Sequence, residues 1–322
     1  MSAKKKKLTA IDIFSGCGGL TLGLKQAGFD VIGAVEIDSL AAETYTANHP
    51  TVKVWERDIR KLTGSEILRE LKIKKGELSL LAGCPPCQGF SSMRTRNGKE
   101  KIRDKRNDLV FDYLRLVKEL KPKAVMMENV PALAENRRME VLKKELKSLG
   151  YEMNGTPLVL NTAEYGVPQR RRRMILVGSR FGKVEFPKGS AARTTVRTAI
   201  GYMPVPGKSG DPLHDFKETR TAKTVEMIRL IPKDGGSRAD LPVRYHLPCH
   251  IRFPQGFKDV YGRMEWNDVS PTITGGCVSP SKGRFLHPSQ NRAISLREAA
   301  LLQTFPRSYY FSLKNGRQGV AL

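Results

Sequence analysis

The feature that most constrains the fold of this chain is a regular alternation in its first half, where short apolar runs are followed by stretches of helical periodicity. The expected strands are residues 10–15, 30–38, 78–83, 123–130 and 173–179. The expected helices are residues 20–29, 39–49, 107–122 and 136–150. Strands that alternate with helices at this spacing indicate an α/β fold, in which a mostly parallel sheet carries helices on both faces.

The second half of the chain has a different composition. Residues 183–290 contain many prolines and glycines and show no regular period, so they predict a smaller, loop-rich module. Regular apolar spacing returns at "ISLREAALLQTF", which predicts an amphipathic helix. Ser295 stands at its start and Glu298 follows three residues later, a pattern typical of a capping box.

The charge of the chain limits the class of its partner. The 322 residues include 56 Lys and Arg against 32 Asp and Glu, a formal net charge of +24. Such an excess favours a polyanion, most simply a nucleic acid, with a basic enzyme that has no such partner as the alternative. The sequence has no apolar stretch long enough to span a bilayer and no signal-peptide core, so we expect a cytoplasmic protein.

The first expected strand leads into a glycine-rich loop, "DIFSGCGG", whose glycines are Gly16, Gly18 and Gly19. Glycines at this place let the backbone approach a ligand at the carboxyl edge of a sheet. Glu36 ends the next strand, where it can bind a ribose diol, and Asp58 further on can accept a hydrogen bond from an adenine amino group. Thr21 stands where the GxGxxG pattern needs its third glycine. The succession favours a nucleoside-containing cofactor, and a tight packing turn is the alternative.

The five cysteines do not form a disulfide pattern, because their number is odd and their spacing is irregular. Cys84 and Cys87 leave three interpretations: half of a metal site, a redox pair, or one nucleophile beside a bystander. No second pair completes four zinc ligands, and dithiol motifs usually open a thioredoxin-like domain. We therefore favour Cys87 as a nucleophilic thiolate just beyond the Pro85–Pro86 turn, with Cys84 packed as a small hydrophobic residue.

Charged residues follow several of the expected strands. The cationic segment 94–106 comes directly after the cysteine pair and suits a loop that closes over a phosphate backbone. Glu128 ends an apolar strand, where a carboxyl group can be partly protonated and act as an acid. Arg171 and Arg173 occupy alternate positions before the last expected strand and can point to one side of it. Each of these features also fits an ordinary charged surface.

In this order, "DIFSGCGG", "GCPPCQGFS", "ENV", "QRRRR" and "REAALLQTFP" resemble the motifs of the C5-cytosine DNA methyltransferases. The resemblance extends from residue 9 to residue 312, nearly the whole chain. It implies a Rossmann-like catalytic domain that binds S-adenosylmethionine and no metal. It also implies transfer of a methyl group to C5 of a flipped-out cytosine in a specific duplex DNA sequence, within a bacterial restriction-modification system.

The same resemblance implies roles for individual residues. Cys87 would add to C6 of cytosine, Glu128 would hold the N3 and N4 edge of the base, and Arg173 would contact its O2, with Arg171 in the same catalytic set. The S-adenosylmethionine site would be lined by Phe14, Gly16, Gly18, Gly19, Glu36, Ile37, Asp58, Ile59, Pro86 and Leu109. The residues expected to contact DNA are Gln88, Ser91, Arg94, Arg96 and Gln169.

The resemblance divides the chain into a catalytic domain at 1–182, a target-recognition region at 183–290 and a return segment at 291–322. A further Gly-Asn-x-Val-Pro-Pro stretch, which family members carry after "REAALLQTFP", is not present in "FSLKNGRQGVAL". We therefore expect weak cofactor binding by the isolated chain, or a second polypeptide that supplies this stretch. The remaining alternatives are methylation of RNA, a catalytically impaired DNA-binding member of the family, and a thiol–disulfide protein.

Overall fold

The computed structural model describes residues 7–86, 108–153, 155, 157–190, 192–216, 219–246, 248–252 and 258–313. These residues form two compact units. Within the described ranges, unit 1 takes residues up to 160, 172–187 and those from 310 onward, and unit 2 takes 161–171 and 188–309. The expected domain ranges 1–182, 183–290 and 291–322 do not coincide with these units, and the roles assigned to those domains stay predictions.

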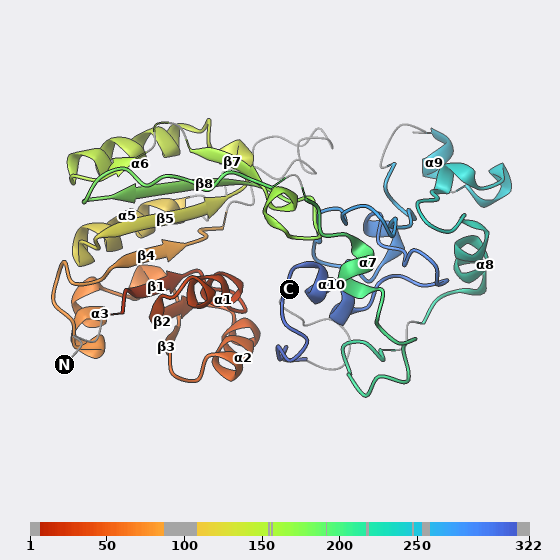
Figure 1. Cartoon of the computed structure of the whole chain (residues 1–322), viewed down its shortest axis with the longest axis horizontal. Helices are drawn as coiled ribbons and strands as arrows, with labels where there is room; N and C mark the ends of the chain where they lie inside the picture. The colour runs from red at the N-terminus through yellow and green to blue at the C-terminus, as the bar shows by residue number, and fades with distance from the viewer. Residues whose placement is uncertain are drawn as a thin grey trace. The chain divides into compact units, whose positions relative to one another are not determined.

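Unit 1 is built around one twisted sheet (Figure 1). Its strands are β1 (Thr9–Ile13), β2 (Asp30–Glu36), β3 (Lys53–Glu56), β4 (Leu80–Gly83), β5 (Ala124–Asn129), β6 (Glu152–Met153), β7 (Leu158–Asn161) and β8 (Arg172–Ser179). The order across the sheet is β3-β2-β1-β4-β5-β8-β6, and β7 also pairs with β8. Strands β1 to β5 are parallel and β8 runs antiparallel to β5, so the prediction of a mostly parallel sheet is confirmed.

Helices cover both faces of this sheet because alternate residues of each strand point to opposite sides. The helices are α1 (Gly19–Gln26), α2 (Ser39–Asn48), α3 (Gly64–Leu71), α5 (Leu109–Leu120) and α6 (Arg137–Ser148). Ile11 and Ile13 join the larger apolar core, which includes buried residues of α3, α5 and α6. Ala10 joins a smaller core on the other face with residues of α1 and α2. The α/β class expected from the sequence is therefore confirmed.

Side-chain caps fix where these helices begin. Asp38 accepts a hydrogen bond from the backbone N–H of Ala41 at the start of α2, and Asn136 accepts one from Arg138 at the start of α6. Each such cap satisfies a backbone donor that the first helical turn leaves unpaired. Helices α1 and α5 differ, because no side chain caps either of them, and the N-cap of α1 is Gly18.

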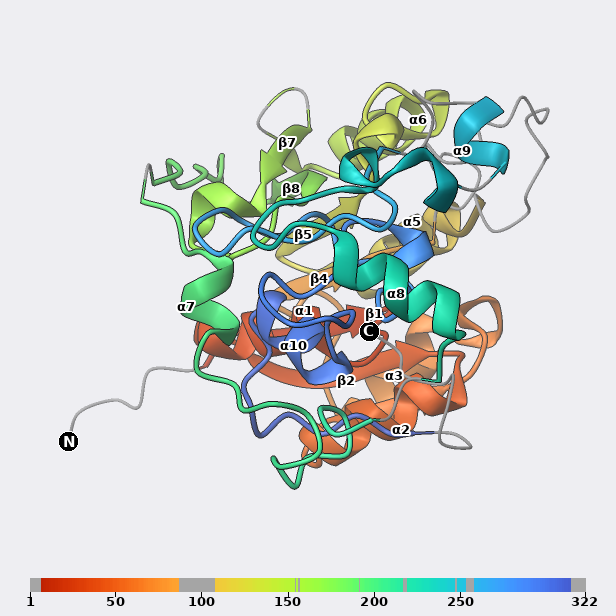
Figure 2. The ribbon, with the colours of Figure 1, turned by 90° about the vertical axis from the view of Figure 1, so that its right-hand side faces the viewer.

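Unit 2 has short helices joined by long irregular segments, as expected for its Pro- and Gly-rich sequence. The helices are α7 (Val196–Ile200), α8 (Ala222–Leu230), α9 (Pro248–Arg252) and α10 (Leu296–Leu302), with 3₁₀ turns at Arg238–Asp240, Val243–Tyr245 and Pro280–Lys282. Figure 2 shows α10 beside α7, and residues of both helices share one small apolar core. The capping box predicted for Ser295 and Glu298 is present at the start of α10.

A buried arginine organises the irregular part of unit 2. Arg263 is fully buried and donates to the carbonyl oxygens of Ile228 and Ile231, at 2.7 and 3.1 Å. It also donates to the carbonyl oxygens of His287 and Gln290, at 2.9 and 2.5 Å. Burial lowers its pKa to about 10, so the guanidinium remains charged at neutral pH. One cation therefore fastens the C-terminal end of α8 to the segment of His287 and Gln290. Among the described residues, no helix is long and apolar enough to cross a membrane.

Candidate active site

The strand order of unit 1 contains a topological switch point beside β1. The chain runs outward from β1 through β2 to β3 and then resumes on the other side of β1 with β4. Ligands of open α/β sheets bind outside the carboxyl ends of the strands at such a point. The segments that follow β1, β4 and β5 are three of those in which the sequence predicts site residues, and their strands are neighbours in the sheet.

Hydrogen bonds connect these three strand ends. The backbone N–H of Cys84, just after β4, donates to the carbonyl oxygen of Ile13 at the end of β1, at 3.3 Å. The amide nitrogen Nδ2 of Asn129, the last residue of β5, donates to the carbonyl oxygen of Pro85 at 2.8 Å. The structure therefore brings together the glycine loop, the double-proline turn and the Glu128–Asn129 pair.

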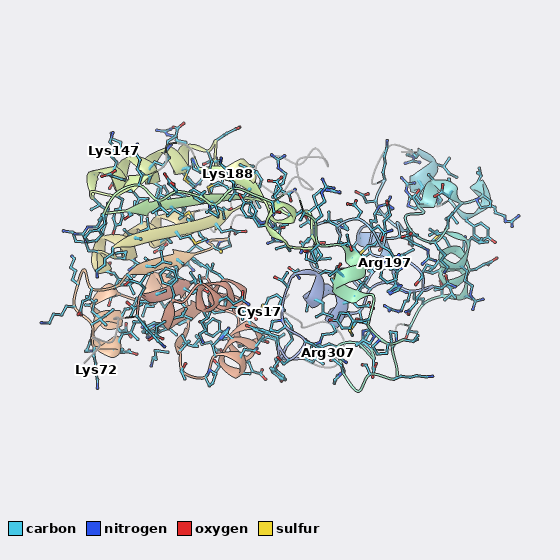
Figure 3. All side chains as sticks on the ribbon, viewed as in Figure 1. Cys17, Lys72, Lys147, Lys188, Arg197 and Arg307 are labelled. Carbon is cyan, nitrogen blue, oxygen red and sulfur yellow. The ribbon has the colours of Figure 1, made fainter. Side chains whose placement is uncertain are left out.

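The loop after β1 has the conformation that its glycines allow. Gly16 and Gly18 have φ angles of 53° and 93°, and Phe14 also lies in the left-handed region at 60°. A Cβ atom at Gly16 would meet nothing within 4 Å, so space lies open beside the backbone there. Cys17 belongs to the same loop (Figure 3), and burial raises the pKa of its thiol to about 11. The loop thus leaves the backbone at Gly16 accessible, while the Cys17 thiol is buried and neutral.

Glu36 fixes the position of this loop. Its Oε2 accepts from the backbone N–H of Gly16 at 2.7 Å, and its Oε1 accepts from those of Ile37 and Asp38 at 2.8 and 2.9 Å. A carboxylate offers about four acceptor positions, so roughly one is left for a ligand hydroxyl. The side chain of Ile37 is 66% exposed beside it, an apolar surface against which an adenine ring can pack.

The segment after β3 supplies the second predicted carboxylate. Asp58 caps the 3₁₀ turn Ile59–Lys61 and accepts from Nε of Arg60 at 3.0 Å. The Arg60 guanidinium holds the pKa of Asp58 below its usual range. The Ile59 side chain, in contrast, is buried in the large core, and Leu109 packs against the same core. The nucleoside part of S-adenosylmethionine fits this set of groups: the accessible backbone at Gly16, the carboxylates of Glu36 and Asp58, and the exposed Ile37 side chain.

An ion pair marks the other side of the switch point. Nε of Arg173, on β8, lies 2.9 Å from Oε1 of Glu128, on β5, and both side chains are mostly buried. Nη1 of Arg173 also donates to the carbonyl oxygen of Arg172 at 2.8 Å. The carboxylate and the guanidinium together offer acceptors and donors side by side, which suits the hydrogen-bonding edge of a pyrimidine.

Two predicted residues lie in unit 2. The backbone N–H of Arg171 donates to Oδ1 of Asn161 at 3.2 Å. Gln169 is 1% exposed, and its side-chain oxygen accepts from the backbone N–H of Ile273 at 3.0 Å. In this structure Gln169 therefore holds the backbone of unit 2, and its contact with DNA stays a prediction.

Several predicted residues lie outside the described part of the chain. They are Cys87, Gln88, Ser91, Arg94 and Arg96. Pro86 is the last described residue before them, and it is half-buried. Among the described residues, no group of three or more His, Cys, Asp or Glu could hold a metal ion. The roles expected for the nucleophile and for the DNA-closing loop stay predictions.

Asn129 is a further residue at the end of strand β5, to which the sequence patterns assigned no role. Its amide both donates to Pro85 and accepts, through Oδ1, from the backbone N–H of Val130 at 2.9 Å. It is 5% exposed. Asn129 could have been predicted from its position, because it directly follows Glu128 at the carboxyl end of a strand beside β4. Asn129 positions the turn that leads to Cys87.

A family model for the C-5 cytosine-specific DNA methylases matches residues 8–320. The chain therefore belongs to this family, and it is a DNA cytosine methyltransferase. It is similar to the Type II methylase M.HgiDII of Herpetosiphon aurantiacus, at 36% identity over 315 residues that cover 94% of this chain and 85% of the relative. It is also similar to the Type II methyltransferase M1.HphI of Haemophilus parahaemolyticus, at 34% identity over 312 residues that cover 94% and 79%.

Among solved structures, the chain is similar to a putative DNA modification methyltransferase encoded within a prophage, from E. coli. The TM-score is 0.66 at 26% identity, with 95% of this chain and 90% of the other covered. The resemblance inferred from the motifs is thereby confirmed. Because the family uses S-adenosylmethionine as co-substrate and DNA as substrate, both follow for this chain.

Proposed function

We propose that this chain methylates C5 of a cytosine in a specific duplex DNA sequence through a covalent adduct, as part of a Type II restriction-modification system. The observation that carries the proposal is the ion pair between Glu128 and Arg173 beside the turn that precedes Cys87. The similar proteins from Herpetosiphon and Haemophilus, which are named as Type II enzymes, support the restriction-modification context.

The reaction needs a nucleophile because C5 of cytosine is itself a weak one. The Cys87 thiolate adds to C6, N3 takes a proton, and the electron pair of the former double bond becomes available at C5. When bound, S-adenosylmethionine would supply the methyl group as a sulfonium donor, with the bond to C5 forming as the sulfur–methyl bond breaks and a neutral thioether remaining. A base then removes the C5 proton, the Cys87 thiolate leaves C6 as the 5,6 double bond re-forms, and N3 returns its proton to Glu128.

Glu128 and Arg173 would hold the base during these steps. The Glu128 carboxyl group accepts from N4 and delivers the proton to N3, while Arg173 donates to O2 and, through its ion pair, fixes the orientation of the carboxyl group. Arg171 belongs to the same proposed set. The cofactor would lie against the Gly16 loop, Glu36 and Ile37, at the switch point.

C6 cannot be reached inside a stacked duplex, so the target cytosine must be flipped out, at a cost of a few kcal/mol. Phosphate contacts from the cationic residues after Cys87 offset this cost. Unit 2 would provide the residues that recognise the sequence. The expected place of action, the bacterial cytoplasm with its nucleoid DNA, stays a prediction.

Bisulfite sequencing of DNA from cells that express the full chain tests the activity and identifies the methylated sequence. A duplex of that sequence with 5-fluorocytosine at the target then traps the adduct, since fluorine cannot leave C5 as a proton does. We expect a stable crosslink at Cys87 in the presence of S-adenosylmethionine, absent in Cys87→Ser and retained in the matched control Cys84→Ser.

Methylation by Cys87→Ser at the wild-type rate would overturn the covalent mechanism. Sequence-specific DNA binding by the wild-type chain without methyl transfer would favour a catalytically impaired member of the family, or one that needs a partner chain. Transfer to RNA in preference to duplex DNA would overturn the proposed substrate.

A further inference from the structure

Three buried polar side chains lie behind the glycine loop and are not used by the proposed mechanism. Asp12 is 1% exposed, and Thr21 and Tyr45 are both at 0%. Oγ1 of Thr21 donates to Oδ2 of Asp12 at 2.7 Å and lies 2.8 Å from the hydroxyl oxygen of Tyr45. While Asp12 is ionised, the single hydroxyl proton of Thr21 goes to Asp12, and the hydroxyl of Tyr45 then donates to Thr21.

The hydrogen bonds therefore join Tyr45, Thr21 and Asp12 in one continuous chain. The second oxygen of Asp12, Oδ1, is buried without a hydrogen-bond partner among the described residues. A buried carboxyl group that is only partly satisfied costs free energy. Such a cost points to a role beyond ordinary packing.

Each of the three residues belongs to an element that borders the proposed cofactor site. Asp12 is on β1, two residues before Phe14 and the glycine loop. Thr21 is in the first turn of α1, which begins where that loop ends and which no side chain caps. Tyr45 is on α2, the helix that follows Glu36 and Ile37. The three side chains thus connect both ends of the glycine loop with the helix after Glu36.

Thr21 is also the residue that replaces the third glycine of the dinucleotide pattern. In that pattern the glycine permits close packing of the helix on the strand. Here a hydroxyl group takes its place and forms hydrogen bonds with the strand on one side and with α2 on the other. At this position, hydrogen bonds of Thr21 to β1 and α2 therefore replace the close helix–strand packing that a glycine would allow.

We infer that Asp12, Thr21 and Tyr45 form a hydrogen-bonded clamp that positions the Gly16 loop and Glu36 for binding S-adenosylmethionine. The inference rests on the proposed cofactor site. The clamp residues are positioning residues, because they act through the loop and do not themselves touch the cofactor. Removing one of them lets α1 and α2 shift, and the hydrogen bond from Gly16 to Glu36 loosens with them.

Thr21→Val and Tyr45→Phe keep the shape of the side chains and remove the hydroxyl groups, while Thr21→Ser keeps the hydroxyl. The matched controls are Thr44→Val, which removes a buried hydroxyl that accepts from Ser312, and Tyr151→Phe, which removes one that donates to Pro122. Calorimetry with S-adenosylmethionine measures the dissociation constant of each full-length variant. Hydrogen exchange of residues 14–19 and 36–41 in the unliganded protein measures the order of the loops.

We expect the dissociation constant to rise roughly three- to tenfold in Thr21→Val and in Tyr45→Phe, the range of one lost hydrogen bond. Exchange in the two loops should accelerate, KM for S-adenosylmethionine should rise at nearly constant kcat, and Thr21→Ser should restore wild-type values. The two controls should lose stability and keep their affinity.

Unchanged loop exchange and unchanged affinity in Thr21→Val and Tyr45→Phe would overturn the clamp. An equal loss of affinity in the two controls would also overturn it, because the effect would then follow from general stability. These measurements do not require methyl transfer, so they are independent of a failure of the covalent mechanism.

Discussion

At the scale of single residues, Asn129 is the neighbour of the proposed catalytic residue Glu128 and holds the backbone around it. Its amide carries one hydrogen bond to the Pro85 carbonyl and one from the Val130 backbone, and both of these partners belong to segments that lead to or from proposed catalytic residues. The turn before Cys87 is therefore tied to the strand end that carries Glu128.

Asn129→Ala should lower kcat strongly with little effect on DNA affinity, because the Pro85 carbonyl, two residues before the proposed nucleophile, would lose its hydrogen bond. A misplacement of about 1 Å can cost on the order of a hundredfold in rate. Steady-state methylation kinetics check this. Asn136→Ala, which removes a helix cap in α6, is the control for lost stability. An unchanged kcat in Asn129→Ala would show that the turn holds its position without the amide.

The raised pKa of Asp12 predicts that the free energy of unfolding depends on pH. Burial raises its pKa from 3.8 to about 7, opposed by the hydrogen bond from Thr21 and assisted by the negative charge of Glu36. Between these two pH values the folded state binds more protons than the unfolded chain. The contribution of Asp12 to stability is therefore fully present below pH 3.8 and is lost as the pH rises through about 7.

Asp12→Asn should remove this contribution to the slope, which is at most about 1.4 kcal/mol per pH unit. Urea unfolding at a series of pH values from 4 to 8 measures it, with Asp30→Asn, at an exposed position of β2, as the control. Identical slopes for wild type and Asp12→Asn would contradict the prediction.

At the scale of elements, apolar spacing and capping residues were sufficient to predict a helix or strand that packs against a single apolar core. The spacing of apolar residues predicted α5 and α6, and the capping box predicted the start of α10. The antiparallel direction of β8 was not predictable, since neighbouring strands determine it through pairing with β5. Helix α3 was also missed, although Thr63 caps it and Ile67, Leu68 and Leu71 lie at helical spacing.

For the site, the sequence predicted several of the residues but not the contacts that position them. The glycine loop, Glu36 and Glu128 stand at strand ends, where sequence alone places them at one edge of a sheet. The contacts of Asn129 and of Arg263 could not be derived in this way, because their acceptors are backbone carbonyls far away in the chain. Every residue has a backbone carbonyl, so the residue type does not show which carbonyl will accept the hydrogen bond.

Helix α10 offers a test at this scale. Glu298 is fully buried, and both its oxygens accept from Arg292, at 2.6 and 2.7 Å. Burial opposes its ionisation, yet the hydrogen bonds and charge of Arg292 hold the pKa of Glu298 below its usual range.

Glu298→Ala would leave the Arg292 charge without its partner and should reduce the free energy of unfolding by about 3–5 kcal/mol. Ser295→Ala removes the hydroxyl that caps α10 and that also lies 2.8 Å from Nδ1 of His214, and it should cost about 1–2 kcal/mol. Denaturant unfolding of both variants decides the matter. Equal losses would mean that the ion pair contributes nothing beyond the cap.

At the scale of the whole molecule, the net charge of +24 dominates encounters with DNA. Each phosphate that the protein neutralises releases bound counterions, so affinity falls with added salt in proportion to the number of contacts. Sequence recognition adds a smaller, less salt-dependent part.

DNA affinity should therefore fall by roughly 10³–10⁵ between 50 and 200 mM salt, the behaviour of proteins that make 6–10 phosphate contacts. Fluorescence anisotropy with a labelled duplex measures it. Cys87→Ser should show the same salt slope, because the substitution removes no cationic group. A flat dependence would mean that the basic residues lie away from the DNA.

Arg263 has a consequence for how enzymes with this architecture diversify. Its guanidinium fastens the C-terminal end of α8, at Ile228 and Ile231, to the stretch around His287. On the proposed role of unit 2 in DNA recognition, substitutions between these anchor points alter the contact surface while the anchored backbone keeps its position. We expect inherited changes of target preference to accumulate there, and the arginine itself to tolerate none.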